Sequence, residues 1–359
     1  MTSEAPPFWW ERPDWRARSL FPVSAIYGAV AGYRMRVAPR ERFDVPVLCI
    51  GNFTVGGTGK TPAAIAFAKA ARSLHLRPGF VSRGYGGNLF QPHVVDPHHD
   101  SAKRVGDEAL LLADHGPVAV SPNRAAGVKL LTEQGCDIII MDDGFQSARI
   151  HIDYALLVID AGRGLGNGHM IPGGPLRAPL IQQLRHADGI LKMGSGEAAD
   201  HVVRLAARAN KPVFVAATRP FNARMDGRRF LAFAGIGNPG RFFQTVRDLG
   251  GEIVRTREFS DHHVFSGEDM DDLGALAAKE GLELITTEKD AVRLRHGSKH
   301  ETAFLARLEV VRIETVFEIE RTPVTVIEET LAAWRKRNAM DGLRAPDASA
   351  TPAAAKRRR

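Results

Sequence analysis

The stretch Thr54–Thr61, TVGGTGKT, combines the residue types that hold a nucleotide phosphate. Glycines let the backbone approach an anion closely, and successive N–H groups at the start of a helix bind it. In such a loop Lys60 would contact the β- and γ-phosphates, and the Thr61 hydroxyl would ligate Mg²⁺. The usual template begins with Gly where this chain has Thr54. We predict a nucleotide site formed by Thr54, Val55, Gly56, Gly57, Thr58, Gly59, Lys60 and Thr61.

Two adjacent acids supply a partner for that metal. The segment CDIIIMDDGFQ places Asp142 and Asp143 directly after a run of apolar residues. Ligands bind at the carboxyl ends of strands in open α/β sheets, and Mg²⁺ prefers oxygen ligands such as carboxylates. We predict that this pair holds Mg²⁺ directly or through water. The residue types leave open which of the two contacts the ion.

Two further clusters carry arginines in loops. SRGYGG offers Arg83, which suits contact with an anion. Residues 162–179 are rich in Gly and Pro, carry Arg163 and Arg177, and are too polar for a core segment. Loops on a rigid scaffold often bind substrate, so we interpret this segment as a substrate loop.

The remaining clusters hold titratable side chains. VGDEALLLA places Asp107 and Glu108 at the start of a helix, where the helix dipole alone would also favour acids. FSDHHVFS brings His262 and His263 to a loop before another helix. Spacing alone does not distinguish a catalytic histidine from an ordinary loop histidine here.

The pattern of apolar runs predicts the scaffold for these clusters. From residue 46 onward, short apolar runs alternate with helical segments, which is typical of a parallel sheet covered on both faces. A second alternation begins near residue 230 and ends with a helix near 325–337. The predicted strands of the first part are 46–50, 79–82, 117–121, 137–141, 154–159, 188–193 and 212–217, and its main helices are 60–74, 106–114 and 124–134.

We therefore predict an α/β fold: a P-loop NTPase-like parallel-sheet domain, a second, smaller α/β domain and an N-terminal membrane-associated helix. The polar, turn-rich stretch 218–228 marks the boundary between the two domains. The ranges are 8–40 for the N-terminal helical segment, 41–220 for the nucleotide-binding domain, 221–337 for the smaller domain and 338–359 for a disordered basic tail.

The N-terminal segment has the composition of a helix that lies on a membrane. Trp, Tyr and Arg flank an apolar stretch, 20–33, that is shorter than the ~20 residues needed to cross a bilayer. These flanking residue types suit the headgroup region. A helix docked on the protein's own core is the alternative, and the flanks favour the interfacial helix. The apolar residues at helical spacing are Val23, Ile26, Tyr27, Val30 and Tyr33.

The net charge of +7 is concentrated at the two ends of the chain. Residues 1–40 carry six Arg and three acids, and residues 335–359 carry eight Lys or Arg and two acids, so the middle sums to −2. Basic ends on a nearly neutral body favour an anionic membrane surface, and we expect no nucleic-acid partner. The two cysteines lie in short apolar runs, which indicates neither disulfides nor a metal cluster and fits a reducing cytoplasm.

Together, GNFTVGGTGKTP, SRGYGG, GDEALLLA, DDGFQ, DAGRGLGNGHMIPGGPLRAP, FSDHH and TTEKDAVRL resemble the tetraacyldisaccharide 4'-kinases, in matching order over residues 15–335. The resemblance implies an enzyme that uses ATP and Mg²⁺ to phosphorylate the 4'-hydroxyl of tetraacyldisaccharide 1-phosphate, giving lipid IVA in lipid A biosynthesis. It implies a peripheral position on the cytoplasmic face of the bacterial inner membrane. The family also lacks the first Gly, so Thr54 does not argue against nucleotide binding.

The resemblance also assigns roles to single residues. Asp107 looks like the base that activates the sugar hydroxyl, and His262 looks like its partner from the second domain, although the adjacent His263 makes that choice ambiguous. Arg83 and Arg177 are implied to contact a substrate phosphate. The catalytic set is completed by Lys60, and the set around magnesium consists of Thr61, Glu108, Asp142, Asp143 and Gln146.

A P-loop GTPase or ATPase switch of the metallochaperone type is the alternative function. Such a protein has a similar loop and reads guanine through a motif that TEKD, residues 287–290, superficially matches. The position of TEKD in the second domain and the lack of a His/Cys-rich tract favour the kinase.

Overall fold

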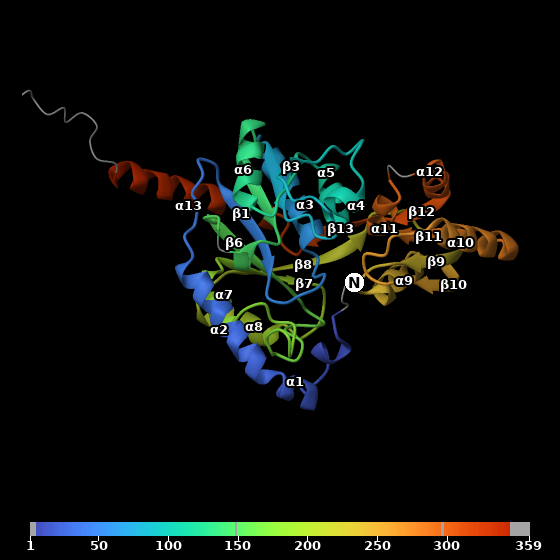
Figure 1. The fold of residues 1–359 in the computed structure, drawn as a ribbon, viewed down its shortest axis with the longest axis horizontal. Helices are drawn as coiled ribbons and strands as arrows, with labels where there is room; N and C mark the ends of the chain where they lie inside the picture. Colours follow the sequence, from blue (N-terminus) through green and yellow to red (C-terminus); the bar gives the residue numbers. More distant parts are fainter. Residues whose placement is uncertain (1–4, 148, 296–297, 345–359) are drawn as a thin grey trace, which may run out of the picture.

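The computed structural model describes residues 5–147, 149–295 and 298–344. Within them, two sheets of unequal size lie side by side, and each has its own helices and hydrophobic core (Figure 1). The predicted α/β class is confirmed, with one large, mainly parallel sheet.

The large sheet has nine strands in the order β13-β8-β7-β6-β1-β5-β2-β4-β3. Neighbours are parallel except at the two edges, where β3 and β13 run antiparallel to β4 and β8. The central strands β1 and β5 are buried along their whole length, which is why they read as continuous apolar runs. The strands are β1 (Val47–Asn52), β2 (Pro78–Ser82), β3 (His93–Val94), β4 (Val118–Val120), β5 (Ile138–Asp142), β6 (Tyr154–Asp160), β7 (Gly189–Met193), β8 (Val213–Pro220) and β13 (Ile313–Phe317).

Helices cover both faces of this sheet. One core contains residues of α3 (Lys60–Ser73), α5 (Asp107–Ala113) and α13 (Thr322–Arg344). The opposite core contains residues of α6 (Arg124–Glu133), α7 (Leu180–His186) and α8 (Asp200–Arg208). The short helix α4 (Ala102–Val105) leads directly into α5.

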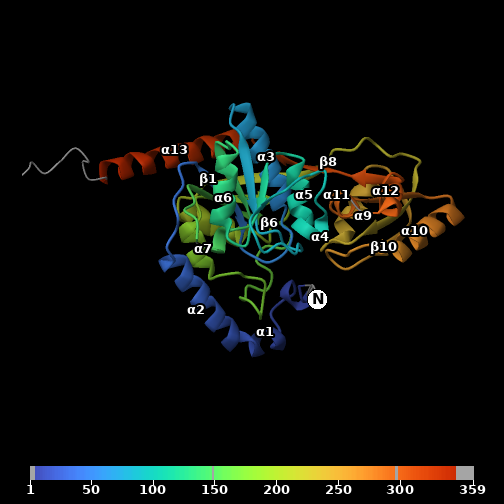
Figure 2. The ribbon, with the colours of Figure 1, turned by 45° about the horizontal axis from the view of Figure 1, so that its top comes forward.

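The small sheet has four parallel strands in the order β10-β9-β11-β12. Both views place it beside α4 and α5 (Figures 1 and 2). We call this part, residues 229–311, the small lobe, and the rest of the body the large lobe. Its elements are β9 (Arg229–Ala234), α9 (Pro239–Asp248), β10 (Glu252–Glu258), α10 (Gly267–Glu280), β11 (Glu283–Thr287), α11 (Glu288–Arg293), α12 (Lys299–Leu305) and β12 (Leu308–Val311).

The end of the chain returns to the large lobe. The sequence assigns 221–337 to the smaller domain, whereas β13 pairs with β8 in the large sheet and α13 packs on α3. We propose that the small lobe is an excursion between β8 and β13. The predicted disordered tail begins at 338, but α13 continues to Arg344, and residues 345–359 lie outside the described part of the chain.

The N-terminal segment forms a 3₁₀ turn (Pro7–Trp9), α1 (Trp15–Ser19) and α2 (Phe21–Val37). The inward face of α2 is made of small or slender residues, Ser24, Gly28, Gly32 and Met35. Gly28 leaves no space for a side chain, because an added Cβ would come within 2.1 Å of the Met170 sulfur. Among the described residues, no helix is long and apolar enough to cross a bilayer.

Candidate active site

The phosphate loop lies between β1 and α3, as the sequence predicts. Gly59 has φ 84°, a left-handed conformation that favours glycine, and it begins the turn into α3. The Lys60 ammonium lies 3.4 Å from the Gly56 carbonyl and is buried against the loop. Backbone amides at this helix start therefore face the place where an anion would bind.

Thr61 and Asp142 meet beside the loop. The Thr61 hydroxyl donates to Oδ2 of Asp142 at 3.0 Å. The other oxygen of Asp142, Oδ1, is buried and has no hydrogen-bond partner among the described residues. Burial, together with the charge of nearby Glu108, raises the pKa of Asp142 to about 7. A cation bound at Asp142 would compensate the buried negative charge and lower the pKa of Asp142 again.

These two side chains fit a magnesium ion. A hydroxyl and a carboxylate are hard oxygen ligands, and Mg²⁺ commonly uses one or two protein ligands besides phosphate oxygens and water. Within residues 5–147, 149–295 and 298–344, no group of three or more His, Cys, Asp or Glu side chains has the arrangement of a metal site. Such a small protein contribution is the usual pattern where a nucleotide supplies part of the coordination.

Asp143 has a different environment from Asp142. Both of its carboxylate oxygens accept from the Arg177 guanidinium, with Nη2 2.8 Å from Oδ2, and Lys60 Nζ lies 3.8 Å away. Burial would raise the pKa of Asp143, but the charges of Lys60 and Arg177 outweigh it and hold the pKa well below its usual range. Arg177 also brings the substrate loop to the phosphate loop. Asp143 is thus paired with cations, which leaves Asp142 as the acid with an available oxygen.

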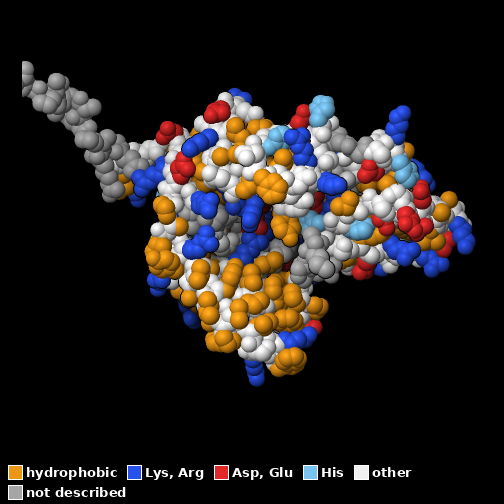
Figure 3. Space-filling model, in the orientation of Figure 1, with side chains coloured by type: hydrophobic (Ala, Val, Ile, Leu, Met, Phe, Trp, Pro, Cys, Tyr) orange, Lys and Arg blue, Asp and Glu red, His pale blue; other side chains and the backbone are white. Residues whose placement is uncertain are grey.

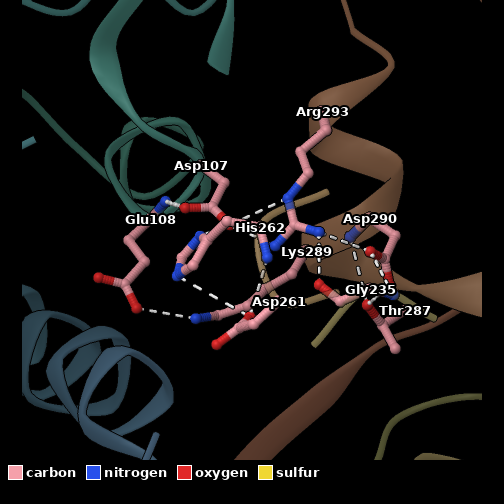
Figure 4. Close-up of polar contacts among 9 residues, drawn as sticks. All are labelled: Asp107, Glu108, Gly235, Asp261, His262, Thr287, Lys289, Asp290 and Arg293. Atoms are coloured by element: carbon pink, nitrogen blue, oxygen red, sulfur yellow. Dashed lines mark hydrogen bonds and ion pairs between the residues drawn. The ribbon is translucent and has the colours of Figure 1, made fainter. Parts of the chain in front are cut away.

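Asp107 and His262 come together from the two lobes (Figure 4). Nδ1 of His262 lies 3.1 Å from Oδ2 of Asp107, and Oδ1 of Asp107 accepts from the Glu108 amide at 3.0 Å. The hydrogen bond to Asp107 raises the pKa of His262. His263 lies on the other side of the loop, where its Nε2 contacts Asp269 at 3.0 Å and its ring stacks on Phe259. Geometry therefore singles out His262.

Arg293 of α11 is a site residue that the sequence analysis missed. Its Nη2 and Nε lie 2.6 and 3.1 Å from Oδ2 of Asp107, and its Nη1 contacts Asp290 and the Gly235 carbonyl, each at 2.7 Å. The side chain is only 5% exposed. Burial would raise the pKa of Asp107, but the hydrogen bond from His262 and the charges of Lys289 and Arg293 lower it strongly. Asp107 is therefore a firmly ionised carboxylate.

Lys289, the second missed residue, pairs with Glu108 across the same junction at 2.8 Å. Burial would lower the pKa of Lys289, but the charges of Glu108 and Asp107 outweigh it and raise the pKa. The two lobes are therefore joined by two consecutive acids of α5 and two cations of α11 (Figure 4). The motif TTEKDAVRL contains both cations and is the signal that could have identified them.

Among the described residues, two predicted ones take no part in the hydrogen bonds and ion pairs of these groups. The Gln146 amide donates to the Asn52 carbonyl at 2.7 Å and to Gln183 at 2.9 Å, so it is directed at the backbone of β1. Arg83 is exposed, and its charge acts on Arg124, whose guanidinium donates to the Asp143 carbonyl at 2.5 Å. Arg83 thus lies near the acid pair without an ion pair to any described residue.

The TEKD motif has a structural role. Thr287 caps α11 by accepting from the Asp290 amide at 3.2 Å, and both oxygens of Asp290 are occupied, by Gly235, Arg293 and Thr287. Asp290 is fully buried. This carboxylate is therefore not available to read a guanine base, which removes the main sequence feature of the GTPase alternative.

Comparison with known proteins identifies the relatives of this chain. The family model for LpxK, tetraacyldisaccharide-1-P 4'-kinase, matches residues 16–331. The tetraacyldisaccharide 4'-kinase of Mesorhizobium japonicum is 61% identical over 94% of this chain and 99% of its own length. That of a Chelativorans species is 54% identical over 93% of this chain and 98% of its own length.

A solved structure has the same fold. The crystal structure described as an "apo" form of LpxK from Aquifex aeolicus in complex with ATP superimposes with a TM-score of 0.68. It is 24% identical and covers 88% of this chain and 99% of its own. The chain described here belongs to the family of tetraacyldisaccharide-1-phosphate 4'-kinases.

Proposed function

We propose that this kinase transfers the γ-phosphate of ATP at the junction of its two lobes, onto the 4'-hydroxyl of tetraacyldisaccharide 1-phosphate. The observation that carries the proposal is the contact between His262 and Asp107. The next residue, Glu108, lies close enough to Asp142, the partner of Thr61, for its charge to act on that acid. ATP is the expected donor because the loop has the Lys60 and Thr61 pair, and because the Aquifex relative was crystallised in complex with ATP.

The phosphate loop binds and orients the donor. Its amides and Lys60 would bind the phosphates, and Thr61 and Asp142 would hold Mg²⁺, which when bound would supply positive charge next to the transferred group. Lys60 is already held by Gly56 and Asp143, so its ammonium is directed into the loop before ATP arrives. Positioning of this kind supplies most of the catalysis in phosphoryl transfer, because the reaction demands little covalent chemistry from the protein.

Asp107 and His262 act on the acceptor. Oδ2 of Asp107 is occupied by His262 and Arg293, whereas Oδ1 has one partner, the Glu108 amide. A sugar hydroxyl can therefore donate to Oδ1 and be aimed at the γ-phosphate. The pair accepts the hydroxyl proton as one unit, since two hydrogen-bonded groups titrate together. The acceptor is a neutral hydroxyl, so removal of its proton is what requires a base.

The ion pairs between the lobes support a closed, water-poor site. Arg293 and Lys289 seat the small lobe on α5, and this places His262 against Asp107. Exclusion of water favours transfer to the sugar over hydrolysis of ATP. Arg83 and Arg177 remain our choices for contact with a phosphate of the substrate, with Arg83 the accessible one of the two.

The helix α2 is the proposed membrane contact. Bulky apolar side chains gather over the α1–α2 corner, with Lys and Arg side chains beside them (Figure 3). A monomeric soluble protein rarely exposes a contiguous apolar patch of this kind without a partner. These residues are more than one-third exposed: Trp15, Phe21, Val23, Ile26, Tyr27, Val30, Tyr33 and Val37.

The direction of α2 supports the same conclusion. The helix packs on the protein through its small residues and turns its large apolar residues outward, the reverse of a helix docked on a core. Basic residues of its last turn, Arg34 and Arg36, suit anionic headgroups. We propose that the protein lies peripherally on the cytoplasmic face of the inner membrane, where an acylated disaccharide would be embedded.

Transfer of label from γ-³²P-ATP to detergent-solubilised tetraacyldisaccharide 1-phosphate tests this function. The wild-type protein should label the lipid in the presence of Mg²⁺, and Lys60→Ala should reduce labelling at least 100-fold. Absence of lipid labelling by the wild type, with ATP bound, would sink the proposal.

A further inference from the structure

Trp10 lies against the phosphate loop, although it belongs to a segment that precedes the family-matched residues 16–331. Its half-buried ring lies 3.8 Å from the position that a Cβ on Gly56 would occupy. The ring helps line a small pocket, together with residues 54–58 of the loop and with Asp160, Arg163 and Gly164. Its place in the fold is thus the outer side of the loop that would hold ATP.

The ring is held from three sides. The Arg163 guanidinium lies over it at 5.1 Å from the ring centroid, a cation–π contact. On another side, Gly166 leaves no space, because an added Cβ would come within 3.2 Å of the Trp10 ring and 2.3 Å of the Trp9 carbonyl. Gly56 forms the third side. A ring held by Gly166 and Arg163 forms a wall beside Gly56, with room for no more than a methyl group between them, and so limits how far the loop can move outward.

The backbone around Trp10 is anchored by hydrogen bonds. Trp9 is buried, its indole donates to the Pro172 carbonyl at 3.0 Å, and its carbonyl accepts from the Asn167 amide at 2.7 Å. The Asn167 side chain, also buried, donates to the Phe8 carbonyl at 3.3 Å and to the Gly173 carbonyl at 2.8 Å. The segment before α1 is thus fastened to the substrate loop.

The substrate loop is itself fastened to the phosphate loop. The amide of Val55 donates to the Pro175 carbonyl at 2.9 Å, and Thr54 and Leu176 form a β-bridge. The next residue, Arg177, holds Asp143. Residues 54–57 therefore have a distant segment at each end: the substrate loop pairs with Thr54 and Val55, and Trp10 lies beside Gly56.

We infer that Trp10 is a positioning residue of the phosphate loop, and that the segment before α1 is needed to hold the loop in the conformation that binds ATP. This inference rests on the proposed function, because it presumes that the loop binds ATP. Glycine-rich loops lose much conformational freedom when they become ordered, so a loop that is fixed before binding pays a smaller entropic cost and binds more tightly.

The test measures ATP binding to the full-length protein in the absence of lipid. Trp10→Ala should weaken ATP binding about 5- to 20-fold and raise the KM for ATP by a similar factor, with the KM for the lipid unchanged. Trp10→Phe keeps an aromatic ring against Gly56 and should restore most of the affinity. Arg163→Gln, which removes the cation but leaves the ring, should give an intermediate loss.

Trp15→Ala is the matched control, because Trp15 is 75% exposed and lies in the same N-terminal segment. It should leave ATP binding unchanged. An ATP affinity of Trp10→Ala within twofold of the wild type, or an equal loss in Trp15→Ala, would overturn the inference. Failure of the wild type to bind ATP would instead refute the proposed function. If Trp10→Ala does not fold, Trp10→Leu and Arg163→Gln decide the question, since unchanged ATP binding in both also overturns it.

Discussion

Nδ1 of His262 lies 3.1 Å from Oδ2 of Asp107, although 155 positions separate the two residues in the chain. One comes from the loop before α10 in the small lobe and the other from the first turn of α5 in the large lobe. The contact therefore depends on how the small lobe docks on α5, and it places His262 beside the residue that we propose as the base.

Replacing Asp107 with Asn should lower kcat about 10²- to 10⁴-fold, the range that general acid–base groups contribute. The amide keeps the shape of the side chain but cannot take the hydroxyl proton. Protection by ATP against thermal unfolding should persist, because the phosphate loop is untouched. Asp114→Asn, at the other end of α5, is the control and should retain activity. A kcat near that of the wild type would remove Asp107 from the chemistry.

The pH dependence of kcat should report His262. The hydrogen bond to Asp107 raises the pKa of His262, and Asp107 itself stays ionised because its pKa is strongly lowered. The pair can accept a proton only while His262 is neutral, so kcat should rise with pH and reach half its limit above the ordinary histidine pKa of about 6.5. His262→Gln should flatten this limb. An unchanged limb in that variant would assign it to another group.

The raised pKa of His262 also makes the stability of the protein depend on pH, in the opposite direction to kcat. A histidine whose folded-state pKa is raised stabilises the native state below the pKa that it has in the unfolded chain. That contribution is lost as pH rises through the folded-state pKa. Activity and the His262 contribution to the free energy of unfolding should therefore change in opposite directions as pH rises above the ordinary histidine pKa of ~6.5. Thermal unfolding of wild type and His262→Gln measures the change in stability.

Arg293→Gln should impair turnover more than ATP binding. The variant leaves the buried carboxylates of Asp107 and Asp290 without their shared cation, a change that typically costs about 3–5 kcal/mol for a buried ion pair. We expect a kcat reduced at least 30-fold with little change in the KM for ATP, and partial recovery in Arg293→Lys. Arg295→Gln breaks an exposed interlobe pair with Asp114 and should have little effect. Equal effects of the two glutamine variants would contradict a special role for Arg293.

Charge on the outer face of α2 should release the protein from membranes. Ile26 and Val30 are 68% and 52% exposed and lie one helical turn apart. In the double variant Ile26→Asp/Val30→Asp, we expect sedimentation with anionic vesicles to fall at least 30-fold, because each buried aliphatic side chain contributes ~2 kcal/mol. Protection by ATP should not change. Ile319→Asp, at an equally exposed position far along the chain, is the control, and a similar loss in it would refute a specific docking face.

The phosphate loop and most strands could be predicted from the sequence, because each depends on residues that are close together in the chain. The phosphate loop follows from its glycines and from the apolar run of β1, and most strands of the large sheet lie within a residue or two of their predicted ranges. The sheet membership of β13 could not be predicted, because a short run such as Ile313–Phe317 does not reveal which distant edge it will join.

The candidate site likewise has a part that could be predicted from local sequence and a part that depends on tertiary contacts. Lys60, Thr61 and Asp142 adjoin recognisable strand ends, so their neighbourhood follows from the topology. Arg293 reads as an ordinary charged residue of a short helix, and only the docking of the small lobe buries it against Asp107. Gln146 adjoins the acid pair in sequence, yet the turn after β5 directs its amide to Asn52 instead.

The two faces of α2 place different limits on the side chains that they can carry. Ser24, Gly28 and Gly32 face the body of the protein, and a methyl group added at Gly28 would collide with Met170. Substitution on this inner face is therefore limited by the space between the helix and the rest of the protein. On the outer side the proposed membrane contact requires only apolar side chains, so exchanges among Val, Ile and Tyr should be tolerated there. An apolar exchange on the outer face should therefore leave the fold intact, whereas any larger residue at Gly28 should push the helix away from the body of the protein.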